Sequence, residues 1–154
     1  MSFKQLVVSK DSFNQSELSN SILNTPPKYL LNITVEKIEA HPEEFINKSV
    51  KQITALLSNN GYEFKVRNSK YKNSTAEIIE ITNPTKERNI TQIQVSPHGS
   101  NRHGNIPYVK ISTSDIGIIK IINGTPKEYL TDGNEKARLI FIRQYKNADS
   151  SENL

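Results

Sequence analysis

Two of the three histidines of the chain, His98 and His103, lie in a short stretch that also contains Arg102 and runs on to Lys110. RNA cleavage by internal attack of a ribose 2′-hydroxyl needs a base, an acid and positive charge on the phosphate oxygens. Histidine, with an ordinary pKa of about 6.5, can serve either proton role. Arginine and lysine stabilise charge that develops on oxygen in the transition state. These four residues are therefore the predicted catalytic groups.

Hydroxyl and aromatic side chains surround this stretch and are predicted to contact a substrate. Ser96 precedes the histidine loop, and Ser112 and Thr113 follow it on an alternating segment, where their hydroxyls are placed to bind phosphate oxygens. Tyr108 lies on the same segment and is expected to stack on a base. The sequence leaves open which of His98 and His103 is the base and which is the acid.

Metal and serine-nucleophile chemistry fit the same stretch less well. No Cys, Asp or Glu lies between Ser96 and Ser114, whereas a hydrolytic zinc site usually takes three protein ligands. A DNase that uses a divalent ion would need further histidines. The pattern G-x-S-x-G is absent from the chain. We therefore expect no metal and no cofactor, and we interpret His41, before Pro42, as a structural residue.

Composition limits the class of protein. The 154 residues suit one domain, and the absence of cysteine excludes disulfides and thiolate metal sites. No apolar run approaches the roughly 18 residues of a membrane-spanning helix. The net charge of +4 is unevenly placed: residues 62–146 carry 14 Lys or Arg against 8 Asp or Glu, a balance of +6. This excess favours a polyanionic partner such as RNA.

A helix is predicted to precede the histidine loop. Pro42 suits a first helical turn, and Ile46, Val50 and Leu57 fall on one helical face. Ser49 is a candidate cap for a second, separate helix. Asn60 and Gly61 tolerate left-handed geometry and predict the helix end. The amphipathic pattern indicates that this region packs against a sheet.

After Gly61 the hydrophobic period changes to two, which indicates strands. Tyr62, Phe64 and Val66 alternate with charged residues in the first of them. Further strand patterns occupy residues 76–82, 89–96, 107–114, 118–122 and 137–143. Short, turn-rich links favour antiparallel pairing. The predicted fold class is α+β, with N-terminal helices packed on one face of a four- to six-stranded antiparallel sheet.

Three segments are predicted along the chain. Residues 1–41 have weak patterns and are interpreted as a linker or a segment that precedes the domain. Residues 42–146 form the nuclease-like domain. Residues 147–154 are polar and are expected to be a disordered tail.

The chain also resembles a known class of proteins over residues 42–143. The motifs that carry the resemblance are FINKSVKQITALLSNNGYEF, NITQIQVSPHGSNRHGNIPYVKISTSDIGIIKII and TDGNEKARLIF. They are similar to C-terminal toxin domains of bacterial polymorphic toxins of the LXG and contact-dependent-inhibition types. Such domains resemble the barnase, EndoU, colicin and RelE-like ribonuclease superfold. The chain departs from barnase in having no obvious glutamate base.

The resemblance implies a metal-independent endoribonuclease toxin, with transfer RNA as one candidate substrate. It implies delivery from a producing bacterium and action in the target-cell cytoplasm. It also implies an acidic cognate immunity protein that blocks the basic surface. Two alternatives remain open: a non-catalytic nucleic-acid-binding accessory protein and a DNase toxin.

Overall fold

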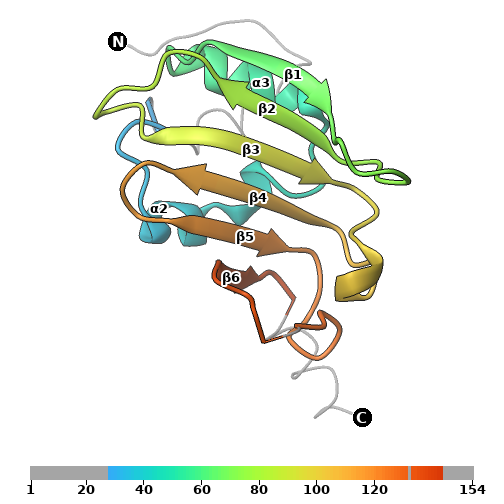
Figure 1. Ribbon diagram of the computed structural model, residues 1–154. Helices are drawn as coiled ribbons and strands as arrows, with labels where there is room; N and C mark the ends of the chain where they lie inside the picture. Colours follow the sequence, from blue (N-terminus) through green and yellow to red (C-terminus); the bar gives the residue numbers. More distant parts are fainter. Residues whose placement is uncertain (1–27, 132, 144–154) are drawn as a thin grey trace, which may run out of the picture.

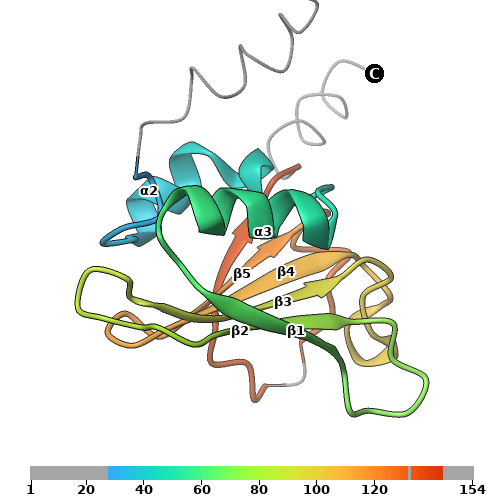
Figure 2. The same cartoon turned by 90° about the horizontal axis from the view of Figure 1, so that it is seen from above.

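A six-stranded sheet with helices on one face forms the protein (Figures 1 and 2). The computed structural model describes residues 28–131 and 133–143. The fold class is α+β, as the sequence predicts. The strands are β1 (Phe64–Asn68), β2 (Glu77–Ile81), β3 (Ile90–Ser96), β4 (Tyr108–Thr113), β5 (Ile118–Ile122) and β6 (Arg138–Phe141).

The strands lie in the sheet in chain order, from β1 to β6. The pairs from β1 to β5 are antiparallel, as expected for strands joined by short links. The last strand differs from the expectation of an entirely antiparallel sheet, because β6 pairs with β5 in parallel. A parallel neighbour requires a connection that returns to the starting end of the sheet. Residues 123–137 make that connection, and part of it lines the site described below.

The helical region contains α2 (Val35–Ala40), a 3₁₀ turn η2 (Pro42–Glu44) and α3 (Val50–Asn59). The pattern from Pro42 to Leu57 is therefore divided, and Ser49 caps a separate helix. Its hydroxyl accepts a hydrogen bond from the Gln52 amide while the Gln52 side chain accepts one from the Ser49 amide. The helix ends at Asn60 and Gly61, as predicted, with Gly61 at a φ of 82°.

The hydrophobic core lies between the helices and one face of the sheet (Figure 2). Phe45, Ile53 and Leu57 are fully buried against isoleucines from the central strands. Alternation along each strand sends these isoleucines to the helix side and polar residues to the other side. Val66 departs from the expected inward pattern: on the edge strand β1 it is 44% exposed.

Residues 28–41 belong to this same core. Tyr29, Leu30 and Ile33 are buried, and two buried asparagines hold their backbone. Asn60 accepts a hydrogen bond from the Leu30 amide, and Asn89 pairs with both the amide and the carbonyl of Ile33. The structure therefore shows no break between residues 41 and 42, where the sequence suggested a boundary. Residues 1–27 and the tail 147–154 lie outside the described residues.

No helix among the described residues is long and apolar enough to cross a membrane.

Candidate active site

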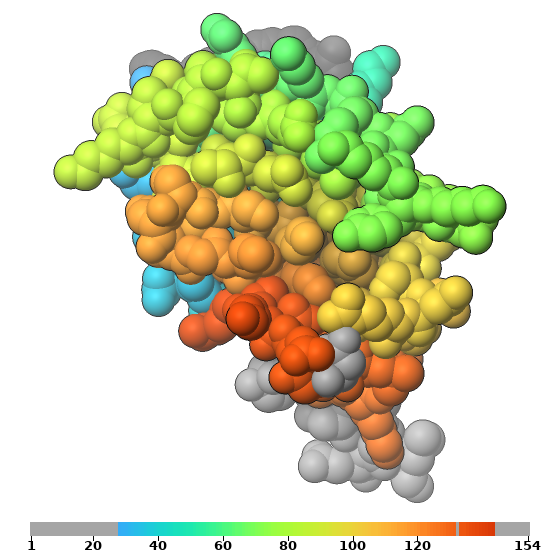
Figure 3. Space-filling view, viewed as in Figure 1, coloured from blue at the N-terminus to red at the C-terminus, as the bar shows by residue number. Residues whose placement is uncertain are grey.

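A cleft of about 860 Å³ lies on the sheet face that the helices leave open (Figure 3). Its floor comes from β3, β4 and β5, and one wall is the loop between β1 and β2. The opposite wall is the turn η3 (Asn101–His103) and its flanking loop, and residues 135–137 close a third side. Seven lysines or arginines line the cleft: Arg67, Lys70, Lys72, Arg102, Lys110, Lys120 and Lys136. Glu135 is the one acidic residue among the lining residues that the structure describes.

The strand register brings three polar side chains together on the floor. Lys110 is directly opposite Gln94 on β3 and directly opposite Lys120 on β5. Residues directly across a ladder project to the same face and contact each other. Gln94, Lys110 and Lys120 therefore form a row across the floor, with two like charges side by side.

Lys120 is held in place by a buried polar cluster. The residue is 7% exposed, and its Nζ donates to the Tyr129 hydroxyl at 2.9 Å and to Glu135 Oε1 at 3.0 Å. The ammonium also lies 5.0 Å from the centre of the Tyr108 ring, within range of a cation–π interaction. A buried ammonium needs such partners, because burial without them is strongly unfavourable.

The same cluster sets the charges of Glu135 and Tyr129. Burial raises the pKa of the Tyr129 phenol, and its hydrogen bond to Glu135 raises it further, so Tyr129 is a neutral donor. Burial alone would raise the pKa of the Glu135 carboxyl, but hydrogen bonds from Lys120 and Tyr129 outweigh it and hold that pKa below its usual value. Glu135 is therefore ionised at neutral pH.

His103 joins this cluster from η3. Its Nδ1 lies 2.6 Å from the Leu130 carbonyl, which can only accept, so Nδ1 carries a proton. The ring stacks on Tyr129 with centroids 4.5 Å apart, and Nε2 lies 4.0 Å from Glu135 Oε1. Nε2 is therefore the ring nitrogen that faces the Glu135 carboxylate.

The loop that carries His103 depends on a glycine. Gly99 has a φ of 63°, and a Cβ there would collide with the Ile106 carbonyl oxygen. Only glycine allows this close approach of two backbone segments. Gly99 therefore allows the loop to follow the path that places η3 near the start of β4.

Lys110 has an unusual electrostatic environment. Burial lowers the pKa of its ammonium, and the nearby Lys120 charge lowers it further, while Glu135 opposes the change. A lowered pKa makes the uncharged amine, the form that can accept a proton, easier to reach for Lys110 than for an exposed lysine.

We expect Lys120→Met to raise the pKa of the Lys110 ammonium towards its ordinary value, because the like charge on the adjacent strand is removed. Methionine retains an apolar chain against the Tyr108 and Tyr129 rings. The measurement is an NMR titration of the Lys110 side chain, with the backbone spectrum showing that the variant is folded. An unchanged Lys110 titration in the folded variant would exclude this coupling.

Six of the eight sequence-predicted site residues line the cleft: Ser96, His98, Arg102, His103, Tyr108 and Lys110. Ser96 is buried, and its hydroxyl accepts a hydrogen bond from Gln94. Tyr108 is 7% exposed and packs edge-on against His103 and Tyr129, so it offers no open ring face for a base.

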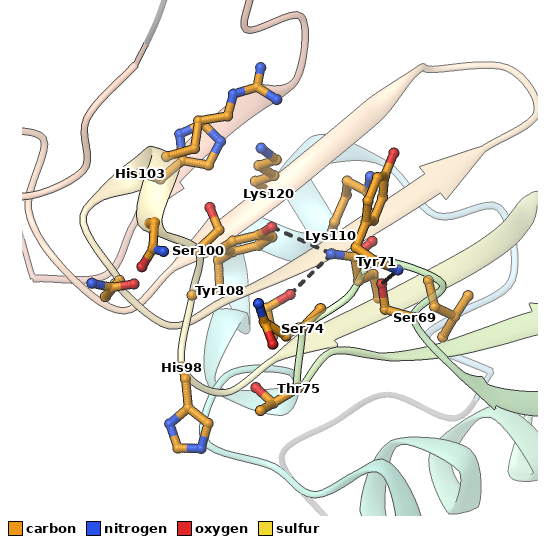
Figure 4. A pocket seen from close by; sticks show the side chains of 18 of the residues that line it. Ser69, Tyr71, Ser74, Thr75, His98, Ser100, His103, Tyr108, Lys110 and Lys120 are labelled. Carbon is orange, nitrogen blue, oxygen red and sulfur yellow. Dashed lines mark hydrogen bonds between the residues drawn. The ribbon is translucent and has the colours of Figure 1, made fainter.

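Three of the eight predicted residues lie away from the floor of the cleft. His98 is exposed at the rim, and its ring projects away from Lys110 and His103 (Figure 4). Ser112 and Thr113 are not among the cleft-lining residues. The Thr113 hydroxyl instead closes the turn before β5 by donating to the Gly117 carbonyl at 2.7 Å.

Sequence reasoning missed Lys120, Tyr129 and Glu135. Lys120 had a detectable signal, since it stands alone among four isoleucines in the segment IIKII. A lysine within an apolar strand usually has a buried partner. Glu135 and Tyr129 lie in a connection without periodicity, and only the fold places them beside Lys120.

The described residues contain no group of three or more His, Asp or Glu that could hold a metal ion. No family model, curated protein or solved structure matches the chain.

Proposed function

We propose that this protein is an endoribonuclease that cleaves RNA in the basic cleft, by attack of a 2′-hydroxyl and without a metal. One observation carries the proposal. His103 and Lys110, two groups with proton-transfer chemistry, both lie beside the Lys120–Glu135 pair: Lys110 is opposite Lys120 in the sheet, and His103 Nε2 lies 4.0 Å from Glu135, in a cleft lined by seven cationic side chains. RNA phosphates would be attracted there by charge.

The two proton-transfer roles are assigned from the surroundings of each group. Lys110, with its lowered pKa, takes the proton from the 2′-hydroxyl in its uncharged form. His103, beside the ionised Glu135, gives the Nε2 proton to the leaving 5′-oxygen. Glu135 is a positioning residue that acts through His103 and Lys120. This assignment replaces the two-histidine scheme that the sequence suggested.

The proposed step balances as a transesterification. The 2′-oxygen forms a bond to phosphorus and the bond from phosphorus to the 5′-oxygen breaks. Lys110 gains one proton and His103 loses one, so the products are a 2′,3′-cyclic phosphate and a 5′-hydroxyl. Arg102 and Lys120 line the same cleft, where positive charge stabilises the phosphorane oxygens.

A non-catalytic nucleic-acid-binding function is the second candidate. The His103 side chain is only 6% exposed, and this burial favours a structural role for its ring. The same basic cleft would then bind RNA without cutting it. The two functions differ in whether a phosphodiester bond is broken.

The resemblance to polymorphic toxin domains extends the proposal to the biological role. On that basis the protein is a toxin delivered by a producing bacterium into the cytoplasm of a target cell, where transfer RNA is one candidate substrate. An acidic immunity protein would cover the cleft, and its charge would complement the seven cations there.

The test is incubation of the protein with total RNA and with plasmid DNA, each with and without EDTA. We expect RNA cleavage that EDTA does not inhibit, fragments with 2′,3′-cyclic phosphate ends, and intact plasmid. His103→Ala is expected to slow cleavage about a hundredfold, whereas His98→Ala changes the rate much less because its ring points away from the floor. Binding of RNA without cleavage would favour the second candidate, and cleavage of the plasmid would indicate a DNase.

A further inference from the structure

Tyr71, in the loop between β1 and β2, is the most exposed large apolar side chain among the described residues. It is 83% exposed, compared with 55% for Leu130, the next in order. The loop is one wall of the cleft, and it curls away from the helices towards the open face of the sheet (Figure 2). An exposed aromatic ring at the side of a cleft presents two open faces to a ligand.

The loop holds the Tyr71 backbone in a defined position. The Tyr71 amide donates to the Ser69 hydroxyl at 3.2 Å, and its carbonyl accepts from the Ser74 amide at 3.2 Å. The base of the loop is closed by a bond from the Ser69 amide to the Ala76 carbonyl at 2.9 Å. Because these bonds fix the backbone at Tyr71, less backbone conformational entropy is lost when a ligand binds.

Cationic residues are close to Tyr71 in the chain, and one of them, Arg67, is paired with Glu80 at 3.0 Å. Lys70 and Lys72 flank Tyr71 in the sequence, and Arg67 lies at the start of the loop on β1; all three line the cleft. Figure 4 shows Tyr71 on the side of the cleft opposite His103, with Lys110 between them. A strand that crosses the cleft from one wall to the other would therefore meet the aromatic ring, then Lys110, then His103.

We propose that Tyr71 stacks on an unpaired base of the RNA while the adjacent phosphate lies over Lys110, so that the cleft selects single-stranded RNA. This inference rests on the proposed function, because it concerns the same cleft. An aromatic ring beside cations that follow the backbone is the arrangement by which proteins bind single strands. A base inside a duplex is already stacked on its neighbours and is not available to the ring. Tyr108, buried under Lys120, does not offer such a surface.

The experiment measures binding to a fluorescently labelled RNA strand with 2′-O-methyl groups, which lack the attacking hydroxyl and cannot be cut. Tyr71→Ala is expected to weaken binding of this strand about 5- to 100-fold, whereas Tyr71→Phe retains the affinity because the ring remains. The same strand with abasic positions should bind equally to the wild type and to Tyr71→Ala. A duplex of the same sequence should also show little difference between these two proteins.

Ile116→Ala is the matched control, because Ile116 is an exposed apolar residue in the turn between β4 and β5, at the other end of these strands. Equal binding of the single strand by wild type and Tyr71→Ala would overturn the stacking proposal. The proposal would also be overturned if Tyr71→Ala weakened binding of the abasic strand as much as binding of the strand with bases. Cleavage is read separately, on unmodified RNA. A wild type that binds through Tyr71 but does not cut would overturn the proposed function and leave the stacking intact.

Discussion

Lys110→Arg is expected to lower the rate of RNA cleavage by about 10²- to 10⁴-fold, the range attributed to a general base. Arginine retains the positive charge but stays protonated at every accessible pH, so it cannot accept a proton from the 2′-hydroxyl. Lys110 is the middle residue of the row that crosses the cleft floor, between Gln94 and Lys120. The measurement is the single-turnover cleavage rate, with saturating protein.

Lys110→Ala separates the two roles of this residue. The substitution removes both the charge and the proposed base. The variant should therefore not cleave RNA, and it should bind more weakly to an RNA strand that cannot be cut. Lys110→Arg should lose cleavage while retaining that binding. If Lys110→Arg cleaves at the wild-type rate, Lys110 acts only through its charge and another residue is the base.

Glu135→Ala is expected to reduce the free energy of unfolding by about 3 to 5 kcal/mol, the usual effect of leaving one member of a buried ion pair without its partner. The side chains of Glu135 and Lys120 are 15% and 9% exposed, and the Tyr129 hydroxyl also donates to Glu135. The loss of the carboxylate would leave a buried ammonium with the Tyr129 oxygen as its remaining hydrogen-bond acceptor among the described contacts. Urea denaturation followed by circular dichroism measures this change.

Two comparisons make this prediction specific. Glu80→Ala removes a carboxylate from the more exposed pair with Arg67, at 3.0 Å, and should change stability by only about 0 to 1 kcal/mol. The double variant Lys120→Met with Glu135→Leu should recover much of the stability, because no unpaired charge remains. A small effect of Glu135→Ala alone would mean that water reaches Lys120 and that the cluster does not depend on this pair.

Local features of the fold were predictable from the sequence because they depend on neighbouring residues. The alternation of apolar and polar residues identified the strands. The Ser49 cap followed from its position before an apolar helical pattern. Ser112 and Thr113 share the strand of Lys110, yet they lie towards its other end. Alternation defines the face of a residue, but the distance along the strand from the loops decides whether it reaches the cleft.

The sequence by itself determined an α+β fold, an excess of positive charge after residue 61 and a glycine-rich loop that carries two histidines. Only the tertiary structure decided that the His103 ring packs into the buried cluster beside Tyr129 while the His98 ring remains at the rim. It also decided that Glu135 pairs with Lys120. The physical reason is that Glu135 lies in the connection to the parallel strand β6, where no periodic pattern exists, and its position depends on contacts between residues distant in the chain.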